Sequence, residues 1–572
     1  MTTAARAVPA APRQSPWTPL RNKVFAALFA AQLASHIGSF FQSVAAAWLM
    51  GDLTSSPTLV ALIPTASLLP VLLLGLPAGA LADIVDRRKL LLATQLWMLT
   101  SAGALAALTL LDLVTPAVLL GLTFAMGVGG ALMGPAWQAI QPDLVPPAEF
   151  PQAVALSSLT FNSGRAIGPA LGGALVAAAG PGWAFVVNAA SFLGTALVLY
   201  LWRPTRSAVR LPPESLSGAL RAGWRYGANA PLLRAVMVRT AAFAIPAAAI
   251  QALLPAVVRD RLSMGSGGFG VMLACFGIGA VGAAIVRPRI DAALPSDRLL
   301  LVSSAVVAVC LVLVGTGEHA WQVGPALFVA GAAWTTATVT TNISAQRALP
   351  WWVRARGLGM YMIVLAGGIA LGSAVWGTIA NWSLPAAHIA AALTLLVGTT
   401  SMLRWRIGTV QELDLRPAQP TEPMVNLDPR PADGPVLITV AYRVAESSHV
   451  EFAEMMRRIE RDRRRSGAEQ WGLFRDLADT DVFLETFVVA TWAEHLRQHQ
   501  RRTVNADVMI RRAKEFVVDD VKVAHLLSAY SDGGLEPVEH PRPRIENAAG
   551  ADGVDTDSVI DADLDGDDVA RG

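Results

Sequence analysis

The sequence predicts an all-α membrane protein of twelve transmembrane helices in two six-helix bundles, followed by a small cytoplasmic α+β domain of the ferredoxin-like type. Of its 572 residues, 53% are hydrophobic and only 15% are charged, whereas a soluble domain is typically about 25% charged. Twelve apolar stretches follow one another between Val24 and Arg406, each near the ~20 residues that cross a bilayer. This composition excludes a disordered chain, a disulfide-stapled secreted module and an ordinary cytosolic enzyme.

The distribution of charge divides the chain into two physically different bodies. Residues 1–410 carry 25 Lys and Arg against 11 Asp and Glu, and residues 411–572 carry 20 against 32. A longer polar break with six arginines separates the twelve apolar stretches into six and six. The expected parts are a disordered N-terminus (1–21), an N-terminal bundle (22–202), a central cytoplasmic loop (203–231), a C-terminal bundle (232–408), a Pro-rich linker (409–434), the α+β domain (435–527) and a disordered acidic tail (528–572).

The positions of Lys and Arg predict the orientation in the membrane. Alternate connections between the apolar stretches hold 21 of them, and the opposite connections hold only Arg259 and Arg261. Because cytoplasmic loops carry the excess of Lys and Arg, both chain ends are expected in the cytoplasm. The protein is then a multi-pass membrane protein.

The residue pattern of the polar C-terminal unit predicts strands and helices in the order β-α-β-β-α-β. The expected elements are a strand at 435–444, a helix at 447–465, a hairpin of 470–477 with 482–490, a helix from Trp492 and a strand at 517–524. His495 and His499 fall one turn apart on the second helix, a spacing that suits a metal. Two ligands do not close a zinc site, so we expect a solvated, charged helix face and no metal.

The connection between the second and third apolar stretches, residues 79–91 (GALADIVDRRKLL), carries the first motif. Gly79 is expected to let two helices approach closely. Asp83 ends a helix beside Arg87 and Arg88, where a helix N-terminus or an arginine can stabilise its carboxylate. Such a link would hold the cytoplasmic face shut and break when that face opens. The loop resembles the signature loop of the major facilitator superfamily, from which it departs at Asp86, where glycine is usual.

The fifth apolar stretch carries the second motif. Gly164, Gly168 and Gly172 lie on one face of a helix, so a neighbouring helix can pack unusually close. Pro169 removes a backbone hydrogen bond and allows a kink, and Gly173 follows. The run resembles the fifth-helix motif of exporters in the same superfamily. The alternative is generic small-residue packing, which any polytopic protein uses.

Arg165 lies within the second motif, about 14 residues and hence ~21 Å from the cytoplasmic end of its helix. At that depth its charge should face the bundle interior or a wet cavity. One interpretation is a cavity cation that meets an anionic or carbonyl-rich substrate. The other is a structural arginine bonded to polar residues such as Asn162, Gln32 or Gln42. Arg239 lies nearer a helix end and is expected to snorkel to the membrane surface.

The apolar stretches contain no carboxylate at mid-membrane depth. A carrier of strongly cationic molecules would need one, so the sequence predicts a neutral or anionic small-molecule substrate. Proton coupling stays open, and its candidate groups are His36, whose ordinary pKa of ~6.5 suits the task, and Asp52 at the outer margin.

Residues 24–406 resemble the superfamily branch that contains the enterobactin exporter and the macrolide-efflux proteins. The resemblance implies a secondary active exporter that works by alternating access. The C-terminal unit is similar to the antibiotic-biosynthesis monooxygenase family, which implies a homodimer through that domain. The alternative is a membrane-anchored ligand-binding or monooxygenase-like enzyme. No nucleotide-binding, hydrolase or CxxC motif occurs, so no catalytic residue, cofactor or nucleic-acid partner is expected.

Overall fold

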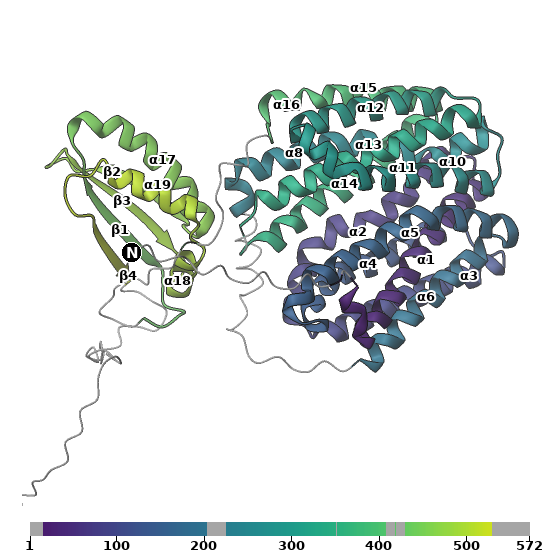
Figure 1. Cartoon of the computed structure of the whole chain (residues 1–572), viewed down its shortest axis with the longest axis horizontal. Coiled ribbons are helices and arrows are strands. Elements are labelled where there is room, and N and C mark those ends of the chain that lie inside the picture. The colour runs from purple at the N-terminus through teal and green to yellow at the C-terminus, as the bar shows by residue number, and fades with distance from the viewer. Residues whose placement is uncertain are drawn as a thin grey trace, which may run out of the picture.

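A computed structural model describes residue 15 and residues 17–202, 225–350, 352–407, 418 and 429–528 of the chain. Most of the expected disordered termini, central loop and linker lies outside the described residues. Disorder throughout 1–21 is wrong, because Thr18–Arg21 form a 3-10 helix directly before α1 (Lys23–Leu53). The side chain of Asp83 also lies outside them. Figure 1 shows a large helical body and, beside one of its ends, a smaller domain built on a sheet. We call the end of the helical body next to that domain the near end and the opposite end the far end.

The helical body consists of two groups of helices that form two layers in Figure 1. The first group contains α1 (Lys23–Leu53), α2 (Pro57–Ile84), α3 (Arg87–Leu110), α4 (Pro116–Leu144), α5 (Phe150–Ala179) and α6 (Pro181–Leu201). The second contains α8 (Pro231–Ala247), α9 (Ala249–Ala252), α10 (Leu254–Ala256), a π-helical turn (Val257–Arg261), α11 (Ser266–Ala293), α12 (Ser296–Thr316), α13 (Ala320–Arg347), α14 (Arg354–Ala380), α15 (Leu384–Thr399) and α16 (Ser401–Arg404). We call these groups the first and second bundles.

Ten helices of the described chain are long and apolar enough to cross a membrane. They confirm a mostly helical membrane protein. The two further expected spans correspond to α5, which is not among the ten, and to α15, an apolar helix of only 16 residues.

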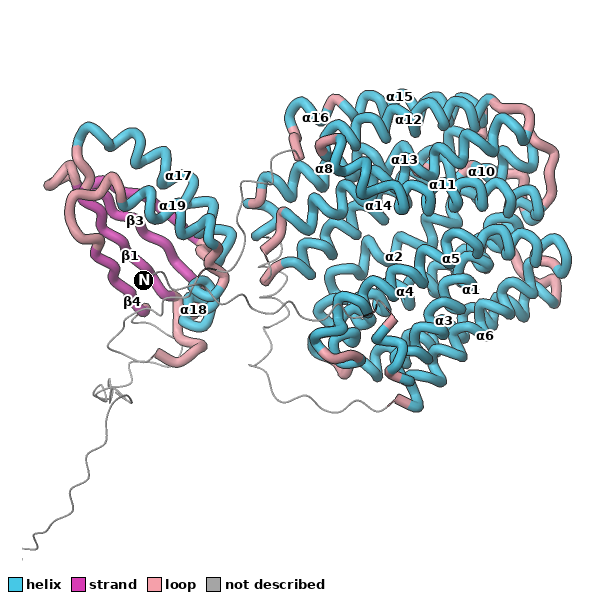
Figure 2. The backbone as a smooth tube through the Cα atoms, in the orientation of Figure 1, coloured by secondary structure: helices cyan, strands magenta, loops and turns pink. Residues whose placement is uncertain are grey.

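The C-terminal domain contains a four-stranded antiparallel sheet with helices against one face, as the tube in Figure 2 shows. Its elements are β1 (Val436–Arg443), α17 (His449–Ser466), β2 (Gln470–Arg475), β3 (Val482–Val489), α18 (Trp492–Gln500), α19 (Val504–Lys514) and β4 (Lys522–Leu527). The strand order is β2-β3-β1-β4. Alternate residues of β1 and β3 are buried, which is the period-2 pattern of strands covered on one side.

Two expectations for this domain are wrong in detail. The last strand begins at Lys522 and not at 517, because Val517 makes only an isolated bridge with Val444 before the chain bends into β4. The second helix is divided into α18 and α19, and α18 does not present a fully solvated face. Trp492 and His495 are 5% and 1% exposed, because this side of α18 packs toward the sheet.

A buried carboxylate organises the interior of the C-terminal domain. Glu485 of β3 is fully buried and accepts hydrogen bonds from Tyr442 Oη at 2.9 Å, Arg463 Nε at 3.0 Å and Trp471 Nε1 at 3.0 Å. Burial opposes ionisation of Glu485, but the charge and hydrogen bonds of Arg463 outweigh it and lower the pKa of this carboxyl. The network joins β1, α17, β2 and β3.

One arginine of the helical body is placed differently from the prediction. Arg239 does not snorkel: it is 3% exposed, and its Nη1 donates to Asp297 Oδ1 at 2.8 Å. Asp297 stands in the first turn of α12 and also accepts from the Ile407 amide at 3.1 Å. Burial of this charge is tolerated because it is paired, and the pair ties α8 and α12 to the chain beyond α16.

We predict that Glu485→Gln destabilises the C-terminal domain by about 3–5 kcal/mol, because Arg463 keeps its charge in the interior without an anion. Since the pKa of Glu485 is lowered on folding, its contribution is present above the unfolded-state pKa and is lost as the pH falls through the folded-state pKa. Hydrogen exchange of the β3 amides in the full chain measures the effect. Glu451→Gln on the exposed side of α17 is the control, and equal exchange in both variants would contradict the assignment.

Candidate functional site

The first and second bundles meet along two helix pairs, α5 with α11 and α2 with α14, which we call the bundle seam. Glycines of the second motif set how closely α5 packs. A Cβ at Gly164, Gly168 or Gly172 would lie 2.9, 2.7 and 3.1 Å from atoms of His36, Phe40 and Phe41 on α1. A Cβ at Gly173 would lie 2.5 Å from the Cα of Gly270 on α11. The motif therefore packs α5 against α1 on one side and across the seam on the other.

The second helix pair of the seam uses hydroxyl groups as well as small residues. Thr58 and Thr65 of α2 donate to the carbonyl oxygens of Gly377 and Ala370 on α14, at 3.1 and 2.8 Å. A Cβ at Gly377 would lie 2.4 Å from the Cβ of Ala61. Such contacts hold helices together in lipid, where the hydrophobic effect gives no attraction between them.

An ion pair closes the seam at the far end. Arg259, in the π-helical turn of the second bundle, donates to Asp52 and to the Gly51 carbonyl on α1. Its guanidinium also lies 4.6 Å from the centre of the Trp48 ring, within cation–π range. These residues line a pocket of ≈ 500 Å³ between the bundles. Both partners keep partial solvent exposure, 30% for Arg259 and 49% for Asp52, so the closure is reversible at low cost.

Arg165 lies on the seam two turns of α5 from Gly173, roughly 12 Å along the helix toward the near end. Its guanidinium is 5.9 Å from the centre of the Phe276 ring on α11. Within the described chain, no hydrogen bond or ion pair is made by its side chain. Two of the three polar residues expected to hold it are bonded elsewhere: Asn162 donates to the Ser158 carbonyl, and Gln42 accepts from Asn188.

His36 packs on α5 just beside Arg165. Its ring meets Phe161 edge-on at 5.4 Å, and its Cβ faces Gly164. The structure thus brings His36 and Arg165 to the same stretch of α5. Asp52 lies apart from them at the far end, where it pairs with Arg259.

The first motif lies at the near end and is bonded within the first bundle. Asp86 caps α3 by accepting from the Lys89 amide at 3.0 Å. Arg87 pairs with Asp143 of α4 at 3.5 Å, and Arg88 donates to the Leu199 and Tyr200 carbonyls at the end of α6. The expected close approach at Gly79 is not seen, because among the described residues no heavy atom lies within 4 Å of a Cβ placed there.

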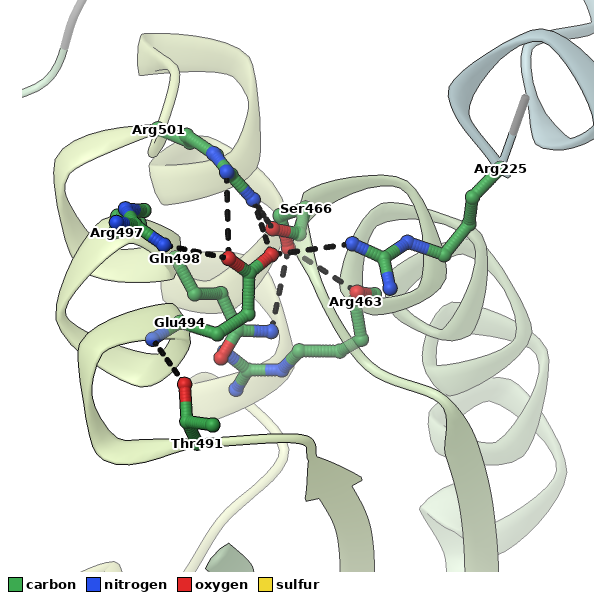
Figure 3. Close-up of polar contacts among 8 residues, drawn as sticks. All are labelled: Arg225, Arg463, Ser466, Thr491, Glu494, Arg497, Gln498 and Arg501. Carbon is green, nitrogen blue, oxygen red and sulfur yellow. Dashed lines mark hydrogen bonds and ion pairs between the residues drawn. The ribbon is translucent and has the colours of Figure 1, made fainter. Parts of the chain in front are cut away.

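The C-terminal domain docks on the near end of the second bundle, as Figure 3 shows. Arg225, six residues before α8, donates to Glu494 of α18 at 3.2 Å. Glu494 also accepts from Arg501 Nη1 at 2.6 Å. Arg501 lies 4.7 Å from the centre of the Trp352 ring, which belongs to the connection between α13 and α14. The contact buries most of the Arg225 and Glu494 side chains, 16% and 13% exposed.

Several of these residues were not singled out from the sequence as site residues. Arg259 had one signal, since it is one of two cations in the connections expected outside. Glu494 and Arg501 had no such signal, because the sequence of a charged helix face is the same whether the face is solvated or docked against another part of the protein.

The two bundles, their seam and the polar groups placed along it define a multi-pass membrane transporter. The family described as transmembrane secretion effector, a family of major facilitator transporters, matches residues 14–532. The chain belongs to that family. The match extends through the C-terminal domain, and the protein is a non-enzymatic transporter.

Curated relatives support this class at low identity. The chain is 32% identical over 177 residues to the uncharacterized MFS-type transporter YfiS of Bacillus subtilis, covering 30% of this chain and 40% of that protein. It is 25% identical to the uncharacterized MFS-type transporter y4rN of Sinorhizobium fredii, covering 66% and 94%. It is 28% identical to the enterobactin exporter EntS of Escherichia coli, covering 40% and 54%.

Solved structures show the same fold. The nucleoside transporter NupG matches with a TM-score of 0.55 at 10% identity, over 67% of this chain and all of that chain. A bacterial homologue of the lysosomal transporter Spinster matches with a TM-score of 0.51 at 14% identity, over 68% and 95%.

We predict that Asp52→Asn and Arg259→Gln each favour opening of the far end. Loss of an exposed ion pair is worth about 1 kcal/mol or less, and Arg259→Gln also loses the contact with Trp48. Labelling of a Ser56→Cys probe by a maleimide, in a chain with Cys275 and Cys310 replaced by Ser, should therefore rise about 2- to 5-fold, and more for Arg259→Gln. Glu318→Gln is the control, because its 3.8 Å pair with Arg261 lies within the second bundle. Equal labelling of all the variants would show that this pair does not close the seam.

Proposed function

We propose that the protein is a secondary active exporter of the bacterial inner membrane that moves a neutral or anionic small molecule by alternating access. In this proposal twelve helices span the membrane as six and six, with α5 and α15 included, and both chain ends lie in the cytoplasm. The two bundles rock about the seam and open the near and far ends in turn. The bilayer and the transported molecule are the partners that the proposal requires.

The position of Arg165 is the observation that supports the proposed class of substrate. It is a half-buried cation on the seam with no bonded partner in the described chain, and it faces an aromatic ring of the other bundle. A charge in that position is costly unless an anion, a carbonyl group or water meets it. A ligand with carboxylate, phenolate or carbonyl oxygens would supply that partner.

Export as the direction rests on relatives and on the second motif. Named relatives include the enterobactin exporter, the multidrug efflux pump Tap of Mycolicibacterium fortuitum and the staphyloferrin A transporter of Staphylococcus aureus. By this analogy a siderophore, a macrolide or another secondary metabolite is the cargo class we propose.

We name His36 and Asp52 as the candidate groups for proton coupling. His36 lies next to the Arg165 stretch of α5, and Asp52 belongs to the far-end closure. Protonation of Asp52 would weaken its pair with Arg259, which would link proton uptake to opening of the far end.

For the C-terminal domain we propose a ferredoxin-like fold related to the antibiotic-biosynthesis monooxygenases, and a homodimer through it. The antiparallel order β2-β3-β1-β4 supports the fold. The sheet face away from the helices supports the dimer, because it presents Phe474 and Leu526, 59% and 50% exposed. The alternative of a monooxygenase-like enzyme is wrong, because the transporter family matches through this domain.

We predict that Arg165→Gln abolishes export while leaving membrane insertion unchanged, because the seam loses its only proposed cargo cation. Arg165→Lys keeps the charge and should retain part of the activity. The measurement compares, by untargeted mass spectrometry, the solutes that accumulate inside cells lacking the protein with those of cells expressing each variant. Undiminished export by Arg165→Gln would refute the substrate site.

We predict that Asp83→Asn also inserts normally and abolishes export, because we place Asp83 with Arg87 and Arg88 in the gate at the near end. The same accumulation assay measures it. Asp112→Asn, at a surface turn between α3 and α4, is the matched carboxylate control. Export at the unsubstituted level in Asp83→Asn would remove the gate assignment and leave the Arg165 site untouched.

A further inference from the structure

Three histidines meet inside the C-terminal domain, outside the transport path. His495 and His499 lie one turn apart on α18, and His525 comes from β4, where it pairs with Ile438 of β1 on the helix-covered face of the sheet. One ring nitrogen from each of the three lies within 4.8 Å of the others. The ring centres of His499 and His525 are 4.8 and 4.9 Å from that of His495.

His495 is buried without the hydrogen bonds that a buried imidazole needs. It is 1% exposed, and neither of its ring nitrogens has a hydrogen-bond partner in the described chain. Gln498 stands nearby, but its amide donates to Ser466 Oγ at 3.3 Å. An unsatisfied buried polar group costs about 1–3 kcal/mol, so this arrangement calls for a partner that the protein side chains do not supply.

The surroundings favour the neutral form of the ring, which is the form that binds metals. Burial, with smaller contributions from His499 and His525, lowers the pKa of His495 to about 3. Trp492 is 5% exposed and covers the cluster, with its ring centre 5.3 Å from that of His495 and 6.2 Å from that of His525.

We propose that His495, His499 and His525 bind a divalent first-row transition metal of the Zn²⁺ class through three imidazole nitrogens. Imidazole suits zinc, copper, nickel and cobalt, whereas Mg²⁺ and Ca²⁺ prefer oxygen ligands. At zinc–nitrogen distances of about 2.0–2.1 Å, tetrahedral ligands lie roughly 3.4 Å apart. The nitrogens, which lie within 4.8 Å of one another, would come to that spacing by rotation of the rings, and a water molecule would fill the fourth position, as in other three-ligand sites.

The sequence alone could not reveal this site. The spacing of His495 and His499 offers two ligands, and His525 lies 26 residues beyond His499 in the chain. Only the pairing of β4 with β1 and the packing of α18 on the sheet bring the third ligand into reach.

Metal at this site would act on the contact between the two parts of the molecule. His495 follows Glu494 directly, and Glu494 is the residue of α18 that binds Arg225 ahead of α8. Fixing His495 and His499 to β4 would hold α18, and with it the Glu494 carboxylate, in the docked position seen in Figure 3. The site is therefore placed to make docking of the domain depend on metal.

Cobalt titration of the full chain tests the proposal. The protein is purified in detergent with a histidine-free affinity tag, stripped with a chelator and titrated with Co²⁺, whose visible absorption reports nitrogen coordination. We expect one equivalent bound per chain and displaced by Zn²⁺. His499→Gln and His525→Gln should each weaken binding at least ~10-fold, since even outer-shell partners of a metal site contribute 10- to 100-fold.

His319→Gln is the matched control, because His319 is exposed at the far end of the helical body, and it should bind Co²⁺ as the unsubstituted chain does. Gel filtration and circular dichroism establish that each variant is folded. His499 and His525 carry the test because they are less buried than His495, whose replacement could disturb packing. Absence of stoichiometric Co²⁺ and Zn²⁺ binding, or binding unchanged in both folded variants, would overturn the proposal.

Discussion

The close approach of α5 to helices of both bundles is the constraint on which the rest of the molecule depends. In lipid, helices gain nothing from hiding apolar surface from one another, so small residues and shared hydrogen bonds decide where they pack. Gly164, Gly168 and Gly172 let α1 lie against one side of α5, and Gly173 meets Gly270 of α11 on the other. A side chain at either surface would separate the helices.

That packing places the charges of the helical body. With α5 fixed between α1 and α11, Arg165 faces the second bundle and His36 lies beside it. The same seam ends at the pair of Asp52 with Arg259, which crosses from one bundle to the other. In the function we propose, the cation on the seam would meet the solute and the ion pair at its end would open and close the far side.

The amino-acid pattern was enough for the broad architecture and too little for the tertiary contacts. Apolar runs predicted the helical body because lipid imposes that composition on every spanning helix. The glycine spacing of the second motif predicted close packing, but not that Gly173 would face a different helix from Gly164. Gly79 has no close neighbour among the described residues, and Arg239 pairs with Asp297 and does not extend to the membrane surface. These outcomes depend on which helices become neighbours, and the spacing of hydrophobic residues along the sequence does not determine that.

The C-terminal domain adds a second level of organisation. Its interior is held by Glu485, whose hydrogen bonds join α17 to three strands. Its α18 carries both the docking carboxylate Glu494 and two of the three clustered histidines. The helix that contacts the transporter is thus also the helix that would respond to a metal.

Pairs of spin labels at the two ends of the helical body test the central claim most directly. One pair, at Leu113 and Glu318, spans the two bundles at the far end, and a second pair, at Glu149 and Arg404, spans them at the near end. Pulsed electron–electron double resonance in lipid should give two distance populations for each pair of labels. Conditions that lengthen the far-end distance should shorten the near-end distance. A single unchanging distance at both ends would contradict a transporter whose bundles rock about this seam.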